Sequence, residues 1–461
     1  MGKHANKPRV VITYGTFDLM HGGHVRLLKR AKELGDYLIV GVTSDNYDLQ
    51  RGKLNVKQSL SERIKAVEAT GLADMVIIEE YEGQKVEDIQ RYNVDVFAIG
   101  SDWKGKFDYL SEFCEVVYLD RTKGISSTQL RGVVRIGIVG SGRIARRFVS
   151  EAKFVSGVEV DWVFNPNLSS ANLFASQMEL GYATDDWSKF IDGVDAVYIA
   201  SPHSTHFHYA RNALTAGRHA LVEKPMALSV DEAARLFQIA QENGLVLLEA
   251  IKTAFAPAFR RILGLAMSNV VGKVRYIEST FTKLVNQGRE LDPRQAGGSF
   301  TELGSYVLLP FVKLCGESDV SVHFRSMRDG PSGVDLWTQA LLKSRDCWGT
   351  ATVGLGVKSE GDLVIGGTDG YIYVPAPWWK PSRFEIRRED PARNEHYCDV
   401  FAGDGLRYEI AHFTQLIQNG HVSSHVLSHS DSLSIARVIE RFRSDENVDW
   451  ITQNVETLPP R

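Results

Sequence analysis

The chain has 461 residues and a mass of 51.4 kDa, longer than one ordinary domain, which predicts two or three. Hydrophobic residues make up 43% and charged residues 24%, so the composition excludes disordered and fibrous proteins. A net charge of -4 argues against nucleic-acid binding. The polar N-terminus and the lack of a ~20-residue apolar run favour a cytoplasmic protein without membrane insertion. Four widely spaced cysteines predict neither a zinc site nor a disulfide framework.

Short apolar segments alternate with helical patterns over the first 120 residues. A first helix is expected from about Gly23 to Leu34, and the strands are expected at 10–14, 37–42, 75–78, 95–99 and 115–119. Apolar strands separated by helices are typical of a parallel, doubly wound sheet that is buried on both faces. The N-terminal part is therefore predicted to be an α/β domain.

The alternation restarts at Arg135 and predicts a second α/β sheet, with strands at 136–139, 158–163, 196–200 and 219–222. After about Val271 the strands become longer and alternate in polarity, as at 274–281, 349–353 and 371–374, with helices at 301–314 and at the C-terminal end. This pattern favours a largely antiparallel sheet packed on the second unit. Since no Pro/Ser-rich linker occurs near Gly132, we expect the two halves to touch.

The first motif follows the first strand and reads GTFDLMHGGH, ending at His24. His21 and His24 would share one face at the positive end of a helix, where phosphate is favoured. Surface or capping histidines would give the same short pattern. A second cluster, RTKGISST over 121–128, again stands between a strand and a helix and supplies further phosphate donors.

With these residues the segment from Val10 to Arg131 closely resembles glycerol-3-phosphate cytidylyltransferase of the HxGH nucleotidyltransferase superfamily. The shared stretches are GTFDLMHGGH, LLKRAKELGDYLIVGV, YNVDVFAIGSDWKGKF and CEVVYLDRTKGISSTQLR. The resemblance implies a Rossmann-like nucleotidyltransferase domain over 1–131. It also implies transfer of CMP from CTP to a polyol phosphate, release of pyrophosphate, and a Mg²⁺ ion bound mostly by water and phosphate.

The same resemblance assigns site residues. His21, His24 and Arg121 would be catalytic, Lys53 would hold the β- and γ-phosphates with Arg121, and Lys85 would contact the acceptor phosphate. The other implied nucleotide contacts are Gly15, Thr16, Phe17, Asp18, Arg51, Arg63, Asp102, Trp103, Thr122, Ser126, Ser127 and Thr128. Two departures bear on nucleotide affinity: Gly71-Leu72-Ala73-Asp74 lacks an arginine usual in the family, and Arg51 replaces a common lysine.

The second motif is GSGRIA after the strand at 136–139, the G-x-G-x-x-A fingerprint of a dinucleotide-binding turn. Gly140 would make the turn, Gly142 would admit the pyrophosphate, and Ala145 would allow close helix packing. The next strand ends at Asn165, neither an acid nor an arginine, so NAD and NADP both stay open. The expected cofactor contacts are Gly140, Ser141, Gly142, Arg143, Ile144, Ala145, Asn165, Ser201, Pro202, His203, His206, Glu223 and Lys224.

Lys224 stands in Glu-Lys-Pro at a strand end, where a lysine is commonly only a surface charge. The run from Arg135 to the C-terminus, however, resembles the Gfo/Idh/MocA oxidoreductases, in its dihydrodiol-dehydrogenase-like branch. The residues that carry this are GSGRIA, SPHSTHFHYARNALTAGRHALVEKPMAL, LLEAIKTAFAP, GGSFTELGSY and GDGLRYEIAHF. The resemblance implies an NAD(P)-binding Rossmann domain over 133–255 and a C-terminal α+β substrate and oligomerisation domain over 256–461, with a large, mostly antiparallel sheet.

Many members of that family place Asp and, four residues later, His where this chain has Glu302 and Tyr306. On a helix this pair shares a face, and with Lys224 it could serve a substrate carbonyl, although ordinary groove residues would fit the same positions. His421, His425 and His429 lack a nearby acid and are interpreted as surface residues rather than metal ligands.

Two nucleotide sites on one chain favour a bifunctional, homo-oligomeric enzyme. The second half would reduce or oxidise a small sugar, triose or polyol, and the first would couple the polyol phosphate to CMP in the same pathway, as in capsule or teichoic-acid (CDP-glycerol) synthesis. Two alternatives stay open: an oxidoreductase that acts on the CDP-linked product, and a non-catalytic NAD-binding scaffold or sensor.

Overall fold

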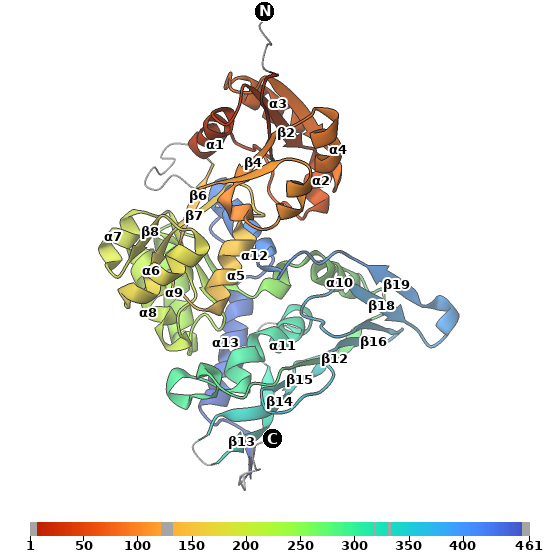
Figure 1. Ribbon diagram of the computed structural model, residues 1–461. Helices are drawn as coiled ribbons and strands as arrows, with labels where there is room; N and C mark the ends of the chain where they lie inside the picture. Colours follow the sequence, from red (N-terminus) through yellow and green to blue (C-terminus); the bar gives the residue numbers. More distant parts are fainter. Residues whose placement is uncertain (1–6, 121–131, 317–319, 331–332, 454–461) are drawn as a thin grey trace, which may run out of the picture.

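The structure, a computed structural model, describes residues 7–120, 132–316, 320–330 and 333–453. Three sheets follow one another along the chain, and Figure 1 shows the first above the other two. In the described part of the chain, no helix has both the length and the apolar character needed to span a membrane.

The N-terminal sheet has the order β3-β2-β1-β4-β5, and all of its strand pairs are parallel. The strands are β1 (Val10–Gly15), β2 (Tyr37–Thr43), β3 (Met75–Glu79), β4 (Val96–Gly100) and β5 (Glu115–Leu119), and the helices are α1 (Gly22–Lys32), α2 (Asp45–Gln50), α3 (Leu60–Glu68) and α4 (Gln84–Arg91). The predicted α/β domain is confirmed. The strand order reverses between β1 and β4, which is where such sheets bind ligands.

The second sheet is also entirely parallel, in the order β11-β10-β9-β6-β7-β8. Its strands are β6 (Val134–Val139), β7 (Val158–Phe164), β8 (Tyr182–Thr184), β9 (Ala196–Ile199), β10 (His219–Glu223) and β11 (Leu247–Ala250). Its helices are α5 (Arg143–Ala152), α6 (Leu168–Met178), α7 (Trp187–Asp192), α8 (His206–Thr215) and α9 (Val230–Glu242). Here the order reverses between β6 and β9, so a second ligand is expected at the carboxyl ends of these two strands.

The third sheet has nine strands in the order β19-β18-β17-β16-β12-β15-β14-β13-β20. They are β12 (Val274–Thr282), β13 (Ser321–Asp329), β14 (Asp335–Lys343), β15 (Trp348–Gly354), β16 (Leu363–Gly367), β17 (Tyr371–Val374), β18 (Arg383–Arg387), β19 (Glu395–Cys398) and β20 (Val448–Gln453). Within the described ranges only β12–β15 and β13–β20 pair in parallel, so the mostly antiparallel prediction is confirmed.

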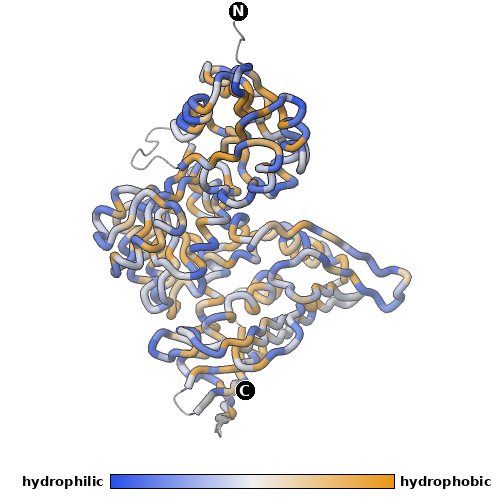
Figure 2. Tube along the Cα trace, in the orientation of Figure 1, coloured by the Kyte–Doolittle hydropathy of each residue, from blue (hydrophilic) through white to orange (hydrophobic). Residues whose placement is uncertain are grey.

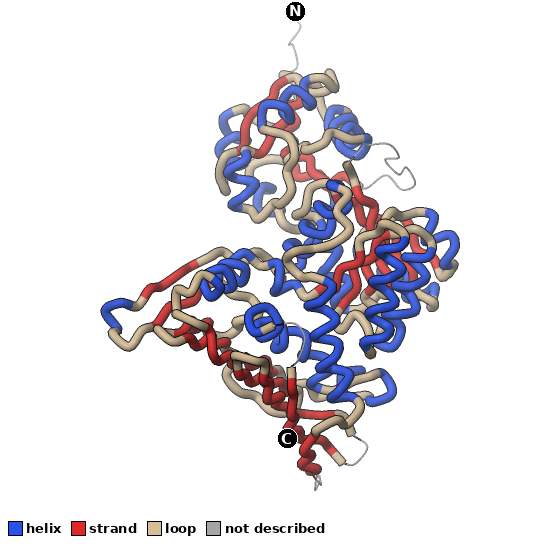
Figure 3. The backbone as a smooth tube through the Cα atoms, turned by 180° about the vertical axis from the view of Figure 1, so that it is seen from behind, coloured by secondary structure: helices blue, strands red, loops and turns tan. Residues whose placement is uncertain are grey.

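Helix α11 (Ser299–Cys315) lies against this sheet and contains the helix predicted at 301–314. The other helices here are α10 (Pro257–Met267), α12 (Leu406–Asn419) and α13 (His429–Arg443), and Figure 3 shows the sheet from behind with helices along its inner side. One continuous core joins the second and third sheets through α11, whereas the N-terminal sheet has its own core on each face. In Figure 2 the hydrophobic stretches of the chain lie mostly inside each unit and the hydrophilic stretches toward its outside.

The cysteines correct the sequence analysis. Cys315 and Cys347 form a disulfide, with Cα atoms 5.7 Å apart, where the sequence predicted none. The pairing depends on the packing of the last turn of α11 beside the start of β15, and a separation of 32 residues gives no local signal for it. Cys114 and Cys398 are free.

Candidate functional sites

The turn after β1 builds the first site. Phe17 and Leu19 have φ values of 52° and 45°, a region that non-glycine residues rarely adopt and that recurs at functional sites. His21 then caps α1, because its Nδ1 accepts a hydrogen bond from the Gly23 amide at 3.1 Å. The rings of His21 and His24 stack with centroids 3.8 Å apart. The two histidines singled out in the sequence therefore lie against each other at the N-terminus of α1.

His24 is held in its neutral form. Burial of the ring lowers the pKa of His24 well below 6.5, and the electrostatic influence of His21 and Lys53 adds to the effect. The buried Nδ1 of His24 has no hydrogen-bond partner among the described residues. A buried ring nitrogen without a partner beside a helix N-terminus is suited to a phosphate oxygen.

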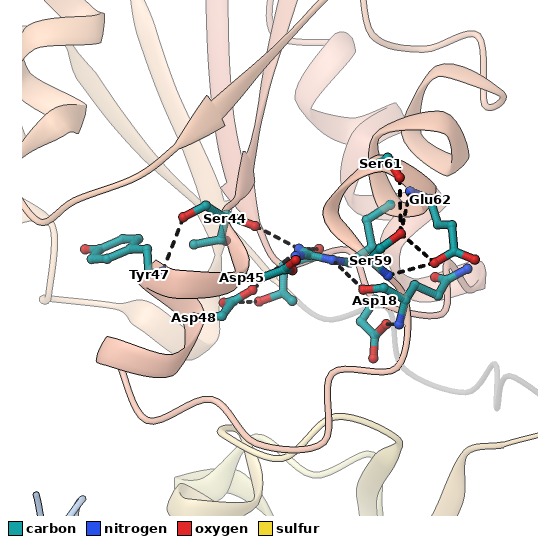
Figure 4. Close-up of polar contacts among 12 residues, drawn as sticks. Asp18, Ser44, Asp45, Tyr47, Asp48, Ser59, Ser61 and Glu62 are labelled. Atoms are coloured by element: carbon teal, nitrogen blue, oxygen red, sulfur yellow. Dashed lines mark hydrogen bonds and ion pairs between the residues drawn. The ribbon is translucent and has the colours of Figure 1, made fainter.

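Arg63 organises the strand ends around this turn. Its buried guanidinium donates to the carbonyls of Thr16 and Thr43, each at 2.8 Å, and forms an ion pair with Asp45. Asp48 accepts hydrogen bonds from the Thr16 hydroxyl at 2.9 Å and from Arg51 at 2.6 Å. Figure 4 shows this network with Asp45 and Asp48 on one side. Thr16, Arg51 and Arg63, expected to bind nucleotide, are engaged with other protein groups in the structure.

The loop between α2 and α3 is bonded to the turn that follows β1. The Asp18 carboxylate accepts the amides of Lys57 and Gln58 at 3.0 and 2.9 Å. Lys53 donates to the carbonyl of Lys153, a residue of the second α/β unit, at 2.7 Å. Burial lowers the pKa of Lys53 to about 8. Lys53 therefore contacts the second unit directly, and its charge also acts on His24.

Two further predicted contacts also face the second unit. Asp102 lies 3.7 Å from the ammonium of Lys153, and the Trp103 ring meets Phe154 edge-on with centroids 6.3 Å apart.

Lys85 is buried in an ion pair with Glu79 and lies over the rings of Tyr14 and Phe107, at 4.7 and 5.3 Å. Desolvation lowers the pKa of Lys85. Because Lys85 already pairs with Glu79, an acceptor phosphate there would have to compete with that carboxylate. The second predicted cluster lies outside the described residues: Arg121, Thr122, Ser126, Ser127 and Thr128.

The turn after β6 fits a dinucleotide. Gly140 has φ 102°, and a Cβ atom there would lie 2.7 Å from the carbonyl oxygen of Ala200, so only glycine is accommodated. Among the residues that the structure describes, a Cβ atom on Gly142 would meet nothing within 4 Å, and no side chain caps α5. Asn165 donates to the Ser141 hydroxyl at 2.9 Å. The uncapped N-terminus of α5 thus faces open space, which a pyrophosphate can fill.

Lys224 and Glu302 meet beyond this turn. The Lys224 ammonium donates to the carbonyl of Glu302 at 2.8 Å and lies 3.8 Å from its carboxylate. The carboxylate also lies 3.6 Å from His203 and 3.4 Å from Arg289. Lys224 lies 5.8 Å from the ring centroid of Tyr306, which burial keeps neutral by raising its pKa well above 10. The structure therefore brings together the three residues expected to be catalytic.

The two nearby histidines differ in their surroundings. Burial lowers the pKa of His203 well below 6.5, and its Nδ1 has no hydrogen-bond partner among the described residues. His206 has its ring nitrogens 2.9 Å from the carbonyls of Pro225 and Ser201, and burial lowers its pKa to about 4. His206 thus ties the ends of β9 and β10 together.

Sequence reasoning missed two contributors to this site. Arg289 contacts Glu302 from a short turn without periodicity, so no local signal pointed to it. Tyr198 donates to Glu223 at 2.6 Å from inside β9, where its position looked like ordinary apolar core. Burial raises the pKa of Glu223, so the residue next to Lys224 is a weaker acid than usual.

The three spaced histidines do not share a helix. His421 and His425 are exposed in a loop, as expected, whereas His429 begins α13 half-buried and stacks on Phe237 at 4.1 Å, which corrects its interpretation as a surface residue. Across the described ranges, no three His, Cys, Asp or Glu side chains gather as a metal site.

Comparison with known proteins connects both sites to families. A cytidylyltransferase-like profile matches residues 12–133, and a profile of the oxidoreductase family with an NAD-binding Rossmann fold, Gfo/Idh/MocA, matches 134–250. Glycerol-3-phosphate cytidylyltransferase of Bacillus spizizenii is 54% identical over 121 residues, which are 26% of this chain and 93% of that protein. The chain is a fusion of a cytidylyltransferase and a Gfo/Idh/MocA oxidoreductase.

The oxidoreductase part has relatives over its whole length. It is 27% identical to the NADP(+)-dependent scyllo-inositol 2-dehydrogenase of Bacillus subtilis, over 68% of this chain and 98% of that one. It is 26% identical to trans-1,2-dihydrobenzene-1,2-diol dehydrogenase of Sus scrofa, over 67% and 96%. A 3-ketoreductase from Actinomadura kijaniata, solved with NADP and TDP-benzene, shares the fold with TM-score 0.62 at 23% identity, covering 69% and 99%.

Proposed function

We propose that the cytidylyltransferase domain, residues 1–131, transfers CMP from CTP to a polyol phosphate of the glycerol 3-phosphate type. An acceptor phosphate oxygen attacks the α-phosphorus, the bond to the β-phosphate breaks, and pyrophosphate leaves with both electrons of that bond. The acceptor is already an anion near neutral pH, so the reaction needs no general base. The protein aligns the phosphates and neutralises the charge that grows at the α-phosphorus.

The stacked pair of His21 and His24 at the N-terminus of α1 supports this proposal most directly. In the proposal both rings contact the α-phosphate, and Lys53 and Arg121 hold the departing phosphates. Lys85 contacts the acceptor phosphate, and Mg²⁺ enters with CTP. The further nucleotide contacts proposed are Gly15, Thr16, Phe17, Asp18, Arg51, Arg63, Asp102, Trp103, Thr122, Ser126, Ser127 and Thr128.

For the oxidoreductase part we propose a Rossmann domain over 133–255 and a substrate and oligomerisation domain over 256–461 in a cytoplasmic homo-oligomer. Its substrate is a small sugar, triose or polyol, or a phosphate of one, in the same pathway. NAD or NADP, held by the turn at 140–145 and by the other contacts named above, supplies or accepts the hydride. Lys224 and Tyr306 share the proton of the substrate oxygen, and Glu302 orients Lys224.

A panel of polyol phosphates incubated with CTP and Mg²⁺ tests the proposed transfer by pyrophosphate release. We expect release with glycerol 3-phosphate or a close relative, and CTP to outperform ATP, GTP and UTP. Equal turnover with UTP would show that the arginine missing at Gly71–Asp74 relaxes base selection. No release with any acceptor would overturn the proposal.

A further inference from the structure

The loop at residues 51–58 of the cytidylyltransferase domain is built partly on the oxidoreductase part. The amide of Leu54 donates to the carbonyl of Phe154 at 2.8 Å, and the amide of Ser156 donates to the carbonyl of Leu54 at 2.8 Å. These two bonds form a short parallel bridge between Leu54 and Val155. The residues at 153–156 directly follow α5, whose opposite end faces the dinucleotide turn.

Helix α12 adds side-chain contacts to the same loop, and Figure 1 shows α5 and α12 beneath the N-terminal domain. Asn55 donates to the carbonyl of Ala411 at 2.9 Å and accepts from Gln415 at 2.6 Å. Arg407 donates to the carbonyl of Gly52 at 3.3 Å and lies 4.0 Å over the ring of Phe154.

Arg407 is itself fixed. It is buried and makes two hydrogen bonds to the carboxylate of Glu151 in α5, at 3.0 and 2.7 Å. The surface that receives the loop, formed by residues 153–156 and Arg407, is therefore rigid on the oxidoreductase side.

On its other side the loop is fixed to the catalytic turn. Asp18 holds the amides of Lys57 and Gln58, and the amide of Leu19 donates to the Gln58 side chain at 2.7 Å. Lys53 lies between these two anchors. Its ammonium has three N–H donors, and the bond to the Lys153 carbonyl uses one of them, which leaves two for phosphate oxygens.

We propose that residues 153–156 and Arg407 of the oxidoreductase part are positioning residues for cytidylyl transfer, because they hold Lys53 where the triphosphate binds. This inference rests on the proposed function, in which Lys53 contacts the departing phosphates. A loop ordered before CTP arrives pays no ordering cost on binding, so its loosening weakens CTP binding and leaves the acceptor site unaffected. The oxidoreductase part thereby completes the CTP site.

Two variants loosen the loop without replacing a residue proposed to contact substrate, and Asn55→Gly also leaves the surroundings of Trp103 intact. Phe154→Ala removes the ring between Arg407 and Trp103. Asn55→Gly removes both side-chain bonds to α12, and glycine tolerates the φ of 61° at this position. The matched control is Gln418→Ala, which removes a contact of α12 with the Gly132 carbonyl at the junction of the two halves and none to residues 51–58.

The experiment measures steady-state kinetics of the full-length chain with CTP and glycerol 3-phosphate. We expect both variants to raise the KM for CTP by about 10-fold, with the KM for glycerol 3-phosphate within 2-fold of wild type. Phe154→Tyr should restore the wild-type KM for CTP, and Gln418→Ala should leave it unchanged.

Several results would overturn the inference. An unchanged KM for CTP in both variants, or an equal rise in Gln418→Ala, would exclude the positioning role while wild-type activity upheld the proposed function. If wild type released no pyrophosphate with any acceptor, the proposed function itself would fall, and the inference with it. Asn55→Gly decides the question if Phe154→Ala does not fold, as judged by its thermal unfolding.

Discussion

His24 is the residue on which the first reaction depends most. We expect His24→Ala to lower CTP-dependent pyrophosphate release by at least ~100-fold, the scale for loss of a preorganised group that stabilises developing charge. Binding of NADH or NADPH should survive, because the two sites lie on separate sheets. Pyrophosphate assays and NADH or NADPH fluorescence titration check this. Retained transfer activity would contradict the role assigned to the histidine pair.

The pKa of Lys53 predicts an upper pH limit for the use of CTP. Burial lowers its pKa to about 8, with Asp48, Arg51, Asp18 and Arg407 as its charged neighbours. The cationic form binds triphosphate and predominates below that pKa, so kcat/KM for CTP should fall as the pH rises through about 8. Lys53→Arg keeps its charge above pH 8 and should abolish this fall. The same fall in the arginine variant would assign it to another group.

Lys224 and Tyr306 make the second reaction testable. Hydride that reaches a carbonyl carbon leaves charge on the oxygen, and both residues can supply its proton. Lys224→Met should therefore slow reduction strongly with cofactor binding near normal, and Tyr306→Phe should cost less, about 10²- to 10⁴-fold. Stopped-flow loss of NADH or NADPH absorbance with keto and aldehyde sugars and their phosphates measures both variants. Unchanged reduction by Lys224→Met would contradict its role.

Residue types and spacing located the candidate catalytic residues but not all of the residues that contact them. The histidine pair and Glu-Lys-Pro were found because their residues are close in sequence and end predicted strands. The contact of Lys53 with Lys153 joins residues 100 positions apart through a backbone carbonyl, and no side-chain pattern encodes such a bond. Arg63 was expected to contact the nucleotide from the family resemblance alone, and the sequence did not show that it is buried and bonded to the Thr16 carbonyl.

At the scale of elements, the β6–α5 turn allows a matched pair of substitutions. Gly142→Ala should leave the unfolding temperature unchanged, because a Cβ there meets no protein atom, but weaken NADPH binding at least ~10-fold by filling the pyrophosphate approach. Gly140→Ala should weaken binding and also lower the unfolding temperature, because its φ of 102° and the Ala200 carbonyl exclude a side chain. Calorimetry and fluorescence titration separate the two effects. Equal binding by Gly142→Ala and wild type would contradict the assigned turn.

Elements were more predictable than their pairing. Period and length located the five strands of the first sheet, helix α11 and strands β6, β7, β9 and β10 of the second sheet, since buried strands and helices carry strong apolar patterns. They missed β8 and β11, which have only three and four residues. The parallel pairs β12–β15 and β13–β20 inside the third sheet, and the disulfide at the end of α11, depend on how distant segments pack.

At the scale of the whole molecule, the contacts of residues 51–58 with the oxidoreductase part predict that a ligand bound to one half changes the other half. CTP without acceptor should slow hydrogen exchange of the Ser156 amide, which is bonded to Leu54, and leave strand β16 unchanged. Coupling between sites is reciprocal. If contact with the oxidoreductase surface strengthens CTP binding, CTP binding strengthens the contact between the two halves by the same free energy. Exchange mass spectrometry measures this. Protection confined to residues 7–120 would contradict it.

Helix α5 has consequences for how such a fusion can evolve. Its ten residues extend about 15 Å, with the dinucleotide turn at one end and the surface for the Lys53 loop at the other. A gene that exchanged the cytidylyltransferase for another nucleotidyltransferase would leave the carbonyls of Lys153 and Phe154 without the donors they now have. A new partner domain would therefore need its own loop with donors placed at the end of this helix, or those carbonyls would be left to water.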